Sequence, residues 1–154
     1  MTKVLDIWHN RWDSTSVLNY PIMRTDSYHL VFLVEDDKFM RELIKRKIES
    51  KSNAIVMAFP SAEEALCRMH LHPDLIMLDF FLDSDNPENM NGHEAVTAFR
   101  KVDPEVPVLF VSAEGNENML VDYQQYRSIP HITKSPFNLA HLHETIPQFW
   151  RQSA

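Results

Sequence analysis

From Leu30 onward, short β-branched apolar runs alternate with segments whose apolar residues recur at helical spacing. This alternation predicts βα units arranged around a parallel sheet. Five such pairs can be counted, with strands expected at residues 30–34, 54–58, 75–78, 106–111 and 128–132. Several runs are apolar almost throughout, which is typical of strands covered by helices on both faces. We therefore predict an α/β fold with a doubly wound, five-stranded parallel sheet.

The expected helices between these strands are marked by apolar residues three and four positions apart. Four of them show this spacing, over residues 40–48, 62–69, 96–102 and 139–149. The remaining helix, fourth in chain order, is expected between residues 115 and 126, where the spacing is weaker. Ser61 and Asn138 are expected to cap the second and last helices, and Pro147 is expected to end or kink the last one.

Pro130 lies within the fifth expected strand and indicates where that strand belongs in the sheet. Proline has no backbone N–H to donate to a neighbouring strand, so it is tolerated mainly at sheet edges. A doubly wound sheet of order 2-1-3-4-5 places its fifth strand at an edge. We therefore expect this flavodoxin-like order.

Composition excludes several classes of function. The 154 residues carry a formal net charge of -7 without a Lys/Arg-rich run, which argues against direct binding to DNA or RNA. Two distant glycines cannot form a P-loop or a GxGxxG turn. Cys67 is the only cysteine, so no intrachain disulfide is possible, as is usual in a reducing compartment. No apolar run has the length of a membrane span. We expect a cytoplasmic protein that does not contact membranes.

Residues 1–28 lie outside the βα pattern and contain Trp8 and Trp12. Four residues apart, these two rings would share one face of a helix. The segment is either a flexible leader, the interpretation we favour, or a docking or dimerising helix. The expected organisation is an N-terminal extension over 1–28, one domain over 29–150 and a tail over 151–154.

Polar residues follow four of the five expected strands. Glu35 and Asp36 follow the first strand, Asp79 the third, Ser112 the fourth and Lys134 the fifth. Because ligands of open α/β sheets bind beyond the carboxyl ends of the strands, these side chains should share one pocket. Each alone could be a helix cap or a solvated residue. Their joint placement favours a site in which clustered carboxylates hold Mg²⁺.

With these residues, the sequence resembles the receiver domain of two-component response regulators. The resemblance covers about residues 29–150 and rests on FLVEDD, LIMLD, VPVLFVSAE and HITKSPF, in the family's order. It implies that Asp79 is the phosphoacceptor and that Glu35 and Asp36 hold Mg²⁺ with it. It also implies that Ser112 is the switch hydroxyl and Lys134 the phosphate-binding lysine.

Other positions depart from the family's pattern. Phe81 would supply a metal ligand through its backbone carbonyl. The loop around it, from Asp79 to Gly92, is long, and its Asp83 and Asp85 either approach the metal or, as we favour, are solvated.

Two further departures lie near the lysine. Ser135 separates Lys134 from Pro136, so the family's cis peptide is moved or absent. His131 stands where the family carries a tyrosine or phenylalanine that turns inward on activation. It is either a pH-tuned switch residue or, as we favour, an exposed edge-strand residue without a special role.

The resemblance implies a stand-alone signalling receiver rather than an enzyme. A sensor histidine kinase or His phosphotransfer protein would phosphorylate Asp79, and an unknown downstream protein would bind the phosphorylated form. Only 20 residues follow Lys134, so we expect no output domain. One alternative is a pseudo-receiver that binds partners without phosphorylation. Another is a Mg²⁺-dependent phosphohydrolase, which Phe81 argues against because such enzymes place a second aspartate there.

Overall fold

A computed structural model describes residues 28–82, 89–113 and 128–151 of the chain. Five parallel strands form one sheet in the order β2-β1-β3-β4-β5, which confirms the predicted topology. The strands are β1 His29–Val34, β2 Ala54–Phe59, β3 Leu75–Asp79, β4 Val108–Ser112 and β5 His131–Thr133. The short fifth strand lies at the sheet edge as predicted, but it begins at His131, so Pro130 precedes the strand instead of lying within it.

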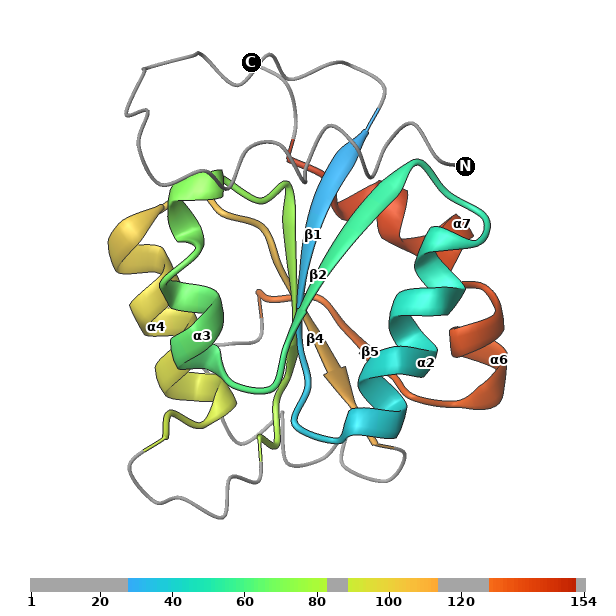
Figure 1. The fold of residues 1–154 in the computed structure, drawn as a ribbon, viewed down its shortest axis with the longest axis horizontal. Helices are drawn as coiled ribbons and strands as arrows, with labels where there is room; N and C mark the ends of the chain where they lie inside the picture. The colour runs from blue at the N-terminus through green and yellow to red at the C-terminus, as the bar shows by residue number, and fades with distance from the viewer. Residues whose placement is uncertain (1–27, 83–88, 114–127, 152–154) are drawn as a thin grey trace, which may run out of the picture.

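Helices cover both faces of this sheet (Figure 1). On one face lie α2 Lys38–Glu49, α6 Pro136–Ala140, α7 Leu142–Thr145 and the 3-10 turn η3 Ile146–Phe149. On the other face lie α3 Ala62–Leu66 and α4 Gly92–Val102, with the 3-10 turn η1 Met69–Leu71 following α3. No helix in the described ranges is long and apolar enough to cross a membrane.

The direction of the side chains alternates along the strands, which produces two separate apolar clusters, one on each face of the sheet. The cluster under α3 and α4 contains Phe32, Val34, Ile76, Leu78, Ala95, Phe99 and Phe110. The cluster under α2, α6 and α7 contains Val31, Leu33, Ile44, Ile48, Met77, Leu109, Leu142 and Ile146. Successive strand residues point to opposite faces, so a strand apolar at every position fills both clusters.

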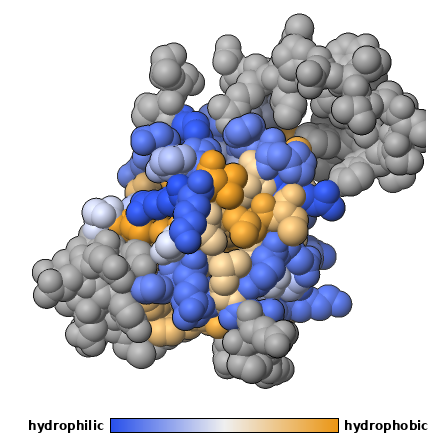
Figure 2. All heavy atoms as spheres, turned by 90° about the vertical axis from the view of Figure 1, so that its left-hand side faces the viewer, coloured by the Kyte–Doolittle hydropathy of each residue, from blue (hydrophilic) through white to orange (hydrophobic). Residues whose placement is uncertain are grey.

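The outer face of the α3 and α4 layer is mixed in character. Figure 2 shows apolar side chains gathered in its middle and hydrophilic ones around them. Val102, the last apolar residue of the helix expected over 96–102, is 57% exposed at the end of α4. The apolar spacing therefore predicted the helix correctly, but Val102 is not part of its buried face.

The helix boundaries differ from the predictions, because the last helix, expected as one element over 139–149, consists of α6, α7 and η3. Ser135, not Asn138, caps α6: its hydroxyl accepts a hydrogen bond from Asn138 N, and Pro136 takes the first helical position. The second helix, expected over 62–69, ends at Leu66, and Cys67 is exposed at the end of α3. Ser61 caps α3 as predicted, and α7 ends two residues before Pro147.

The last described residues contact the amino ends of the strands. The Trp150 ring stacks on His29, with 4.4 Å between ring centroids and an interplanar angle of 8°. Arg151 N donates to the Asp74 carbonyl over 3.0 Å, and the Arg151 guanidinium pairs with the Asp103 carboxylate. The expected fourth helix, Trp8, Trp12, Asp83 and Asp85 lie outside the described residues.

Candidate functional site

The carboxyl ends of neighbouring strands bring the predicted polar residues together. Asp79 is the last residue of β3 and pairs in register with Val111 of β4, directly before Ser112. Ser112 pairs with Thr133 of β5, directly before Lys134, and Lys134 N donates to the Ser112 carbonyl over 2.7 Å. The sheet register therefore sets these residues beside one another.

Three carboxylates meet at this edge. One oxygen from each of Glu35, Asp36 and Asp79 lies within 4.8 Å of the other two. Glu35 and Asp79 are buried, and Asp36 is partly exposed. Within the described ranges, this is the one group of three Asp, Glu, His or Cys residues that could hold a metal. A set of hard carboxylate oxygens with one side open to solvent fits Mg²⁺, which keeps several waters when bound to proteins.

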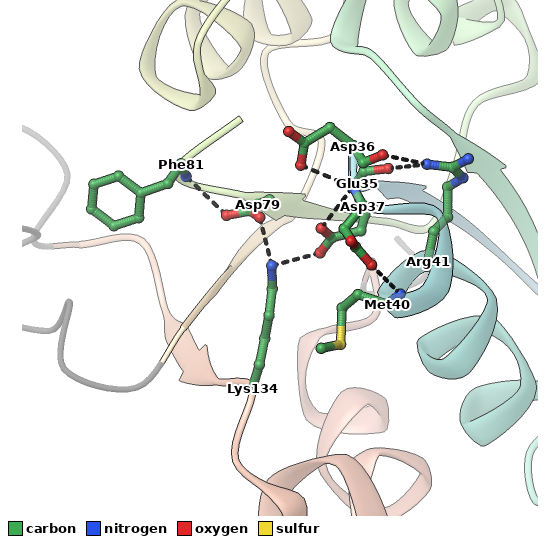
Figure 3. Close-up of polar contacts among 8 residues, drawn as sticks. All are labelled: Glu35, Asp36, Asp37, Met40, Arg41, Asp79, Phe81 and Lys134. Carbon is green, nitrogen blue, oxygen red and sulfur yellow. Dashed lines mark hydrogen bonds and ion pairs between the residues drawn. The ribbon is translucent and has the colours of Figure 1, made fainter. Parts of the chain in front are cut away.

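Lys134 bridges two of these acids (Figure 3). Its Nζ lies 2.5 Å from Asp79 Oδ2 and 2.6 Å from Glu35 Oε2, and its side chain is 10% exposed. Burial by itself lowers the pKa of Lys134, but the hydrogen bonds and charges of the two carboxylates outweigh it and raise that pKa above its ordinary value. The site therefore contains a fixed positive charge between Asp79 and Glu35.

Glu35 is the acid whose ionisation is most disfavoured. Burial raises the pKa of Glu35 to about 7; the Lys134 hydrogen bond opposes this rise, and the Asp79 charge adds to it. A neighbouring cation favours the ionised form of a carboxyl group. Even with Lys134 in place, Glu35 therefore has too little neighbouring positive charge to ionise as readily as an ordinary glutamate, and a divalent cation would supply such charge.

Ser112 contributes a hydroxyl that makes no hydrogen bond within the described part of the chain. The residue is fully buried, and its Oγ has no hydrogen-bond partner among the residues that the structure describes. A buried hydroxyl without a partner is unfavourable, and such groups in native proteins call for a specific explanation. The position next to Asp79 and Lys134 provides one, because a phosphoryl oxygen would be an acceptor for it.

Asp79 itself is oriented by the residue two positions later. Phe81 N donates to Asp79 Oδ1 over 2.8 Å, while Lys134 occupies Asp79 Oδ2. The Phe81 ring packs edge-on against Phe80, with 4.9 Å between centroids. Both oxygens of the expected phosphoacceptor are therefore held in place.

Sequence reasoning missed two residues that shape the surroundings of Glu35 and Asp36, Asp37 in the same loop and Arg41 in α2. Asp37 caps α2 by accepting a hydrogen bond from Met40 N over 2.6 Å, so Glu35 and Asp36 are not needed as caps. Arg41 Nη1 donates to the carbonyls of Glu35 and Asp36. The sequence spacing between Asp37 and Arg41 could have revealed this contact, because a residue four positions after the cap lies one helical turn on and its side chain can reach back to the loop.

The corner between β5 and α6 has a different construction from the family's. The described residues contain no cis peptide bond. Asn138 Nδ2 instead donates to the carbonyl oxygen and to Oγ1 of Thr133, over 3.1 and 2.9 Å, and Ser135 caps α6. These bonds fix the chain on both sides of Lys134. Sequence reasoning assigned Asn138 to the cap and so missed this role.

His131 is the first residue of β5, is exposed and pairs in register with Phe110 of β4. This position agrees with the interpretation of His131 as an exposed edge-strand residue. A role of His131 in switching stays a prediction.

Comparisons with known proteins agree with this arrangement. The model of the response regulator receiver domain family matches residues 31–147. Chemotaxis protein CheY of Bacillus subtilis (strain 168) is 28% identical over 119 residues, which span 77% of this chain and 94% of CheY. Transcriptional regulatory protein CssR of the same organism is 33% identical over 86 residues, which span 55% of this chain and 35% of CssR.

Solved structures show the same fold. The receiver domain of NtrX from Brucella abortus superposes with a TM-score of 0.67 at 22% sequence identity, over 80% of this chain and 99% of that one. The family match spans most of the sheet, both helical layers and every residue of the carboxyl-end site. The chain therefore belongs to the response regulator receiver domain family.

Proposed function

We propose that this protein is a signalling receiver that accepts a phosphoryl group on Asp79, with Mg²⁺ held by Glu35, Asp36, Asp79 and the backbone carbonyl of Phe81. A phosphohistidine on a sensor histidine kinase or His phosphotransfer protein is the donor. The observation that carries this proposal is the convergence of three carboxylates with Lys134 at the carboxyl edge of the sheet. Family membership supports it independently.

In the proposed reaction, a carboxylate oxygen of Asp79 attacks the phosphorus of the phosphohistidine. The new O–P bond gives an acyl phosphate, the P–N bond breaks, and its electron pair returns to the imidazole nitrogen. When bound, Mg²⁺ supplies positive charge to the phosphoryl oxygens and to the surrounding carboxylates. Lys134, whose Nζ lies 2.5 Å from Asp79 Oδ2, supplies a second positive charge that is already in the site before the donor binds.

The signal then passes through the strands beside the site. The Ser112 hydroxyl, without a partner among the described residues, donates to a phosphoryl oxygen in this proposal. Ser112 and Lys134 are joined through the backbone between β4 and β5, so a shift of either residue displaces the edge of the sheet. A downstream protein in the cytoplasm binds that altered edge, and signalling proceeds by protein contact.

The test is phosphorylation by a small donor. The full chain is incubated with Mg²⁺ and acetyl phosphate, and its intact mass is recorded beside that of Asp79→Asn. The proposal expects one added phosphoryl group on the wild type, and none on Asp79→Asn or without Mg²⁺. Asp103→Asn is the matched control, because Asp103 lies near the amino ends of the strands and should leave the gain intact. A wild type that stays unmodified while folded and bound to Mg²⁺ overturns the proposal.

A further inference from the structure

One side chain, that of Arg41, donates to two carbonyls of the β1–α2 loop, residues 35–37. We infer that Arg41 is the positioning residue for the acidic pair: its guanidinium holds the carbonyls of Glu35 and Asp36 away from Asp79, so that the carboxylates of both residues are set for a cation. The inference rests on the proposed function, because the cation site is part of that proposal. Among the described residues, the Arg41 guanidinium bonds to the carbonyls of Glu35 and Asp36 and not to Asp79, the proposed phosphoacceptor.

The contacts of Arg41 cover every carbonyl of the loop. Its Nη1 donates to the Glu35 carbonyl over 2.6 Å and to the Asp36 carbonyl over 3.0 Å. Its backbone N donates to the Asp37 carbonyl over 2.9 Å. Figure 3 shows both carbonyls pointing to Arg41, with the Glu35 carboxylate turned the other way, toward Lys134.

A single peptide unit carries this constraint to the carboxylates. The peptide bond between Asp36 and Asp37 is planar, so the direction of its carbonyl fixes the direction of its N–H. Arg41 binds the carbonyl side, and the N–H side donates to Asp36 Oδ1 over 3.0 Å and to Glu35 Oε1 over 3.3 Å. Fixing this peptide therefore orients one oxygen of each carboxylate, whereas releasing it removes that constraint from both and leaves Glu35 with its contact to Lys134.

Geometry and charge make opposite predictions for the removal of Arg41. The guanidinium is a positive charge near the cation site, so by Coulomb's law alone its loss should strengthen cation binding. If Arg41 positions the acids, its loss should weaken cation binding, because Mg²⁺ demands near-ideal octahedral geometry. The sign of the change in affinity therefore separates the two effects.

The experiment is a calorimetric Mg²⁺ titration of the full chain without phosphodonor. Arg41→Met should bind Mg²⁺ about ten-fold more weakly than the wild type, as loss of an outer residue that orients metal ligands typically does. Arg41→Lys should be weakened too, because a compact ammonium keeps the charge but not the planar donor group. Arg46→Met, an exposed arginine in the last turn of the same helix, should stay within two-fold of the wild type, or about 0.4 kcal/mol.

Two further measurements exclude a loss of fold as the cause. Because Ca²⁺ accepts irregular geometry, Arg41→Met should lose more affinity for Mg²⁺ than for Ca²⁺, a difference that partial unfolding does not produce. Without any metal, hydrogen exchange at the Asp37 amide should be faster in Arg41→Met and unchanged in Arg46→Met. If Arg41→Met does not fold, Arg41→Lys decides by the same two readouts.

The results also separate this inference from the proposed function. Equal or tighter Mg²⁺ binding by Arg41→Met overturns the inference, and so does a wild type that binds no Mg²⁺. A wild type that binds Mg²⁺ but takes no phosphoryl group from acetyl phosphate overturns the proposed function only. Weaker Mg²⁺ binding by Arg41→Met then still supports the positioning role.

Discussion

Gly92, the first residue of α4, lies against the backbone of Phe80. A Cβ built at Gly92 would stand 2.5 Å from the Phe80 carbonyl oxygen and 2.7 Å from that of Asp79. Real Cβ atoms do not approach backbone atoms so closely. The absence of a side chain at Gly92 therefore lets α4 start directly on the end of β3 that carries Asp79.

Gly92→Ala is expected to destabilise the protein by about 2 kcal/mol, the range observed when an extra methyl group is forced into a packed interior. The obstacles are backbone atoms, so no side chain can rotate away to make room. Urea denaturation measures the effect. Thr97→Ala, at an exposed position of the same helix, should change the free energy of unfolding by less than about 0.5 kcal/mol. Equal stability of Gly92→Ala and wild type would contradict the close contact.

Ser112→Ala is expected to leave the free energy of unfolding unchanged or to raise it by up to about 1 kcal/mol. The substitution removes a buried hydroxyl that has no partner among the described residues, so no hydrogen bond is lost. Ser52→Ala provides the contrast, because Ser52 Oγ donates to the Ile48 carbonyl over 2.6 Å, and its loss should destabilise the protein. Thermal unfolding measures the change in stability of both variants. A clear loss of stability in Ser112→Ala would show that the hydroxyl supports the fold.

Lys134→Met is expected to bind Mg²⁺ about ten-fold more tightly than the wild type, equivalent to ~1.4 kcal/mol. Lys134 occupies the same two carboxylates, Glu35 and Asp79, that the cation would use, so the two positive charges compete. Calorimetric titration measures the affinity. Lys38→Met removes an exposed lysine at the start of α2 and should have a smaller effect, because solvent screens its charge. Weaker binding in Lys134→Met would show that the lysine supports the cation site instead.

The pair of Arg151 and Asp103 should make stability depend on pH in the acid range. Burial alone raises the pKa of Asp103, but the hydrogen bond and charge of Arg151 outweigh it and hold that pKa below its ordinary value. Because the folded protein binds the proton less readily than the unfolded one, the pair stabilises the fold above the ordinary pKa of aspartate. That stabilisation is lost as the pH falls through the lowered value.

Asp103→Asn should therefore cost about 1–2 kcal/mol at neutral pH. The difference from the wild type should shrink as the pH falls through the lowered pKa of Asp103. Urea denaturation at a series of pH values checks the trend. A difference that stays constant from neutral to acid pH would rule out the Arg151 ion pair as its source.

Side chains of α2 should protect the edge strand β2 from pairing with other chains. Val56 N donates to Glu49 Oε1 over 3.0 Å, and the Val56 carbonyl accepts from Lys45 Nζ over 2.5 Å. Replacing both side chains, with Lys45→Met and Glu49→Ala, should leave edge groups unpaired and promote self-association that rises with protein concentration. Sedimentation velocity measures this. The matched control, Lys47→Met with Glu42→Ala on the exposed face of α2, should stay at the wild-type association state.

The parts of the fold that follow from local periodicity could be predicted from the sequence. Strands that are buried on both faces give continuous apolar runs, so the sheet and its order were correct even though β5 is only three residues long. The positions of Asp79 and Ser112 followed from the same rule, because residues at the carboxyl ends of adjacent parallel strands are brought together.

Features that depend on competition between side chains could not be predicted. Asn138 and Ser135 are both good caps, and the choice between them was decided by Pro136, which suits the first helical position, and by bonds from Asn138 to Thr133. Arg41 was missed because its partners are backbone carbonyls, so only its spacing from the cap residue Asp37, and not the type of any partner side chain, pointed to it.

The stacking of His29 on Trp150 also determines how this domain can be connected to other polypeptides. It brings the first strand and the last described turn together at the amino ends of the strands, whereas Asp79 lies at the carboxyl end of β3. Domains whose entry and exit points adjoin tolerate circular permutation and insertion into a host loop. This architecture can therefore be inserted into larger assemblies with the carboxylate cluster at the carboxyl end of the sheet directed away from the points of attachment.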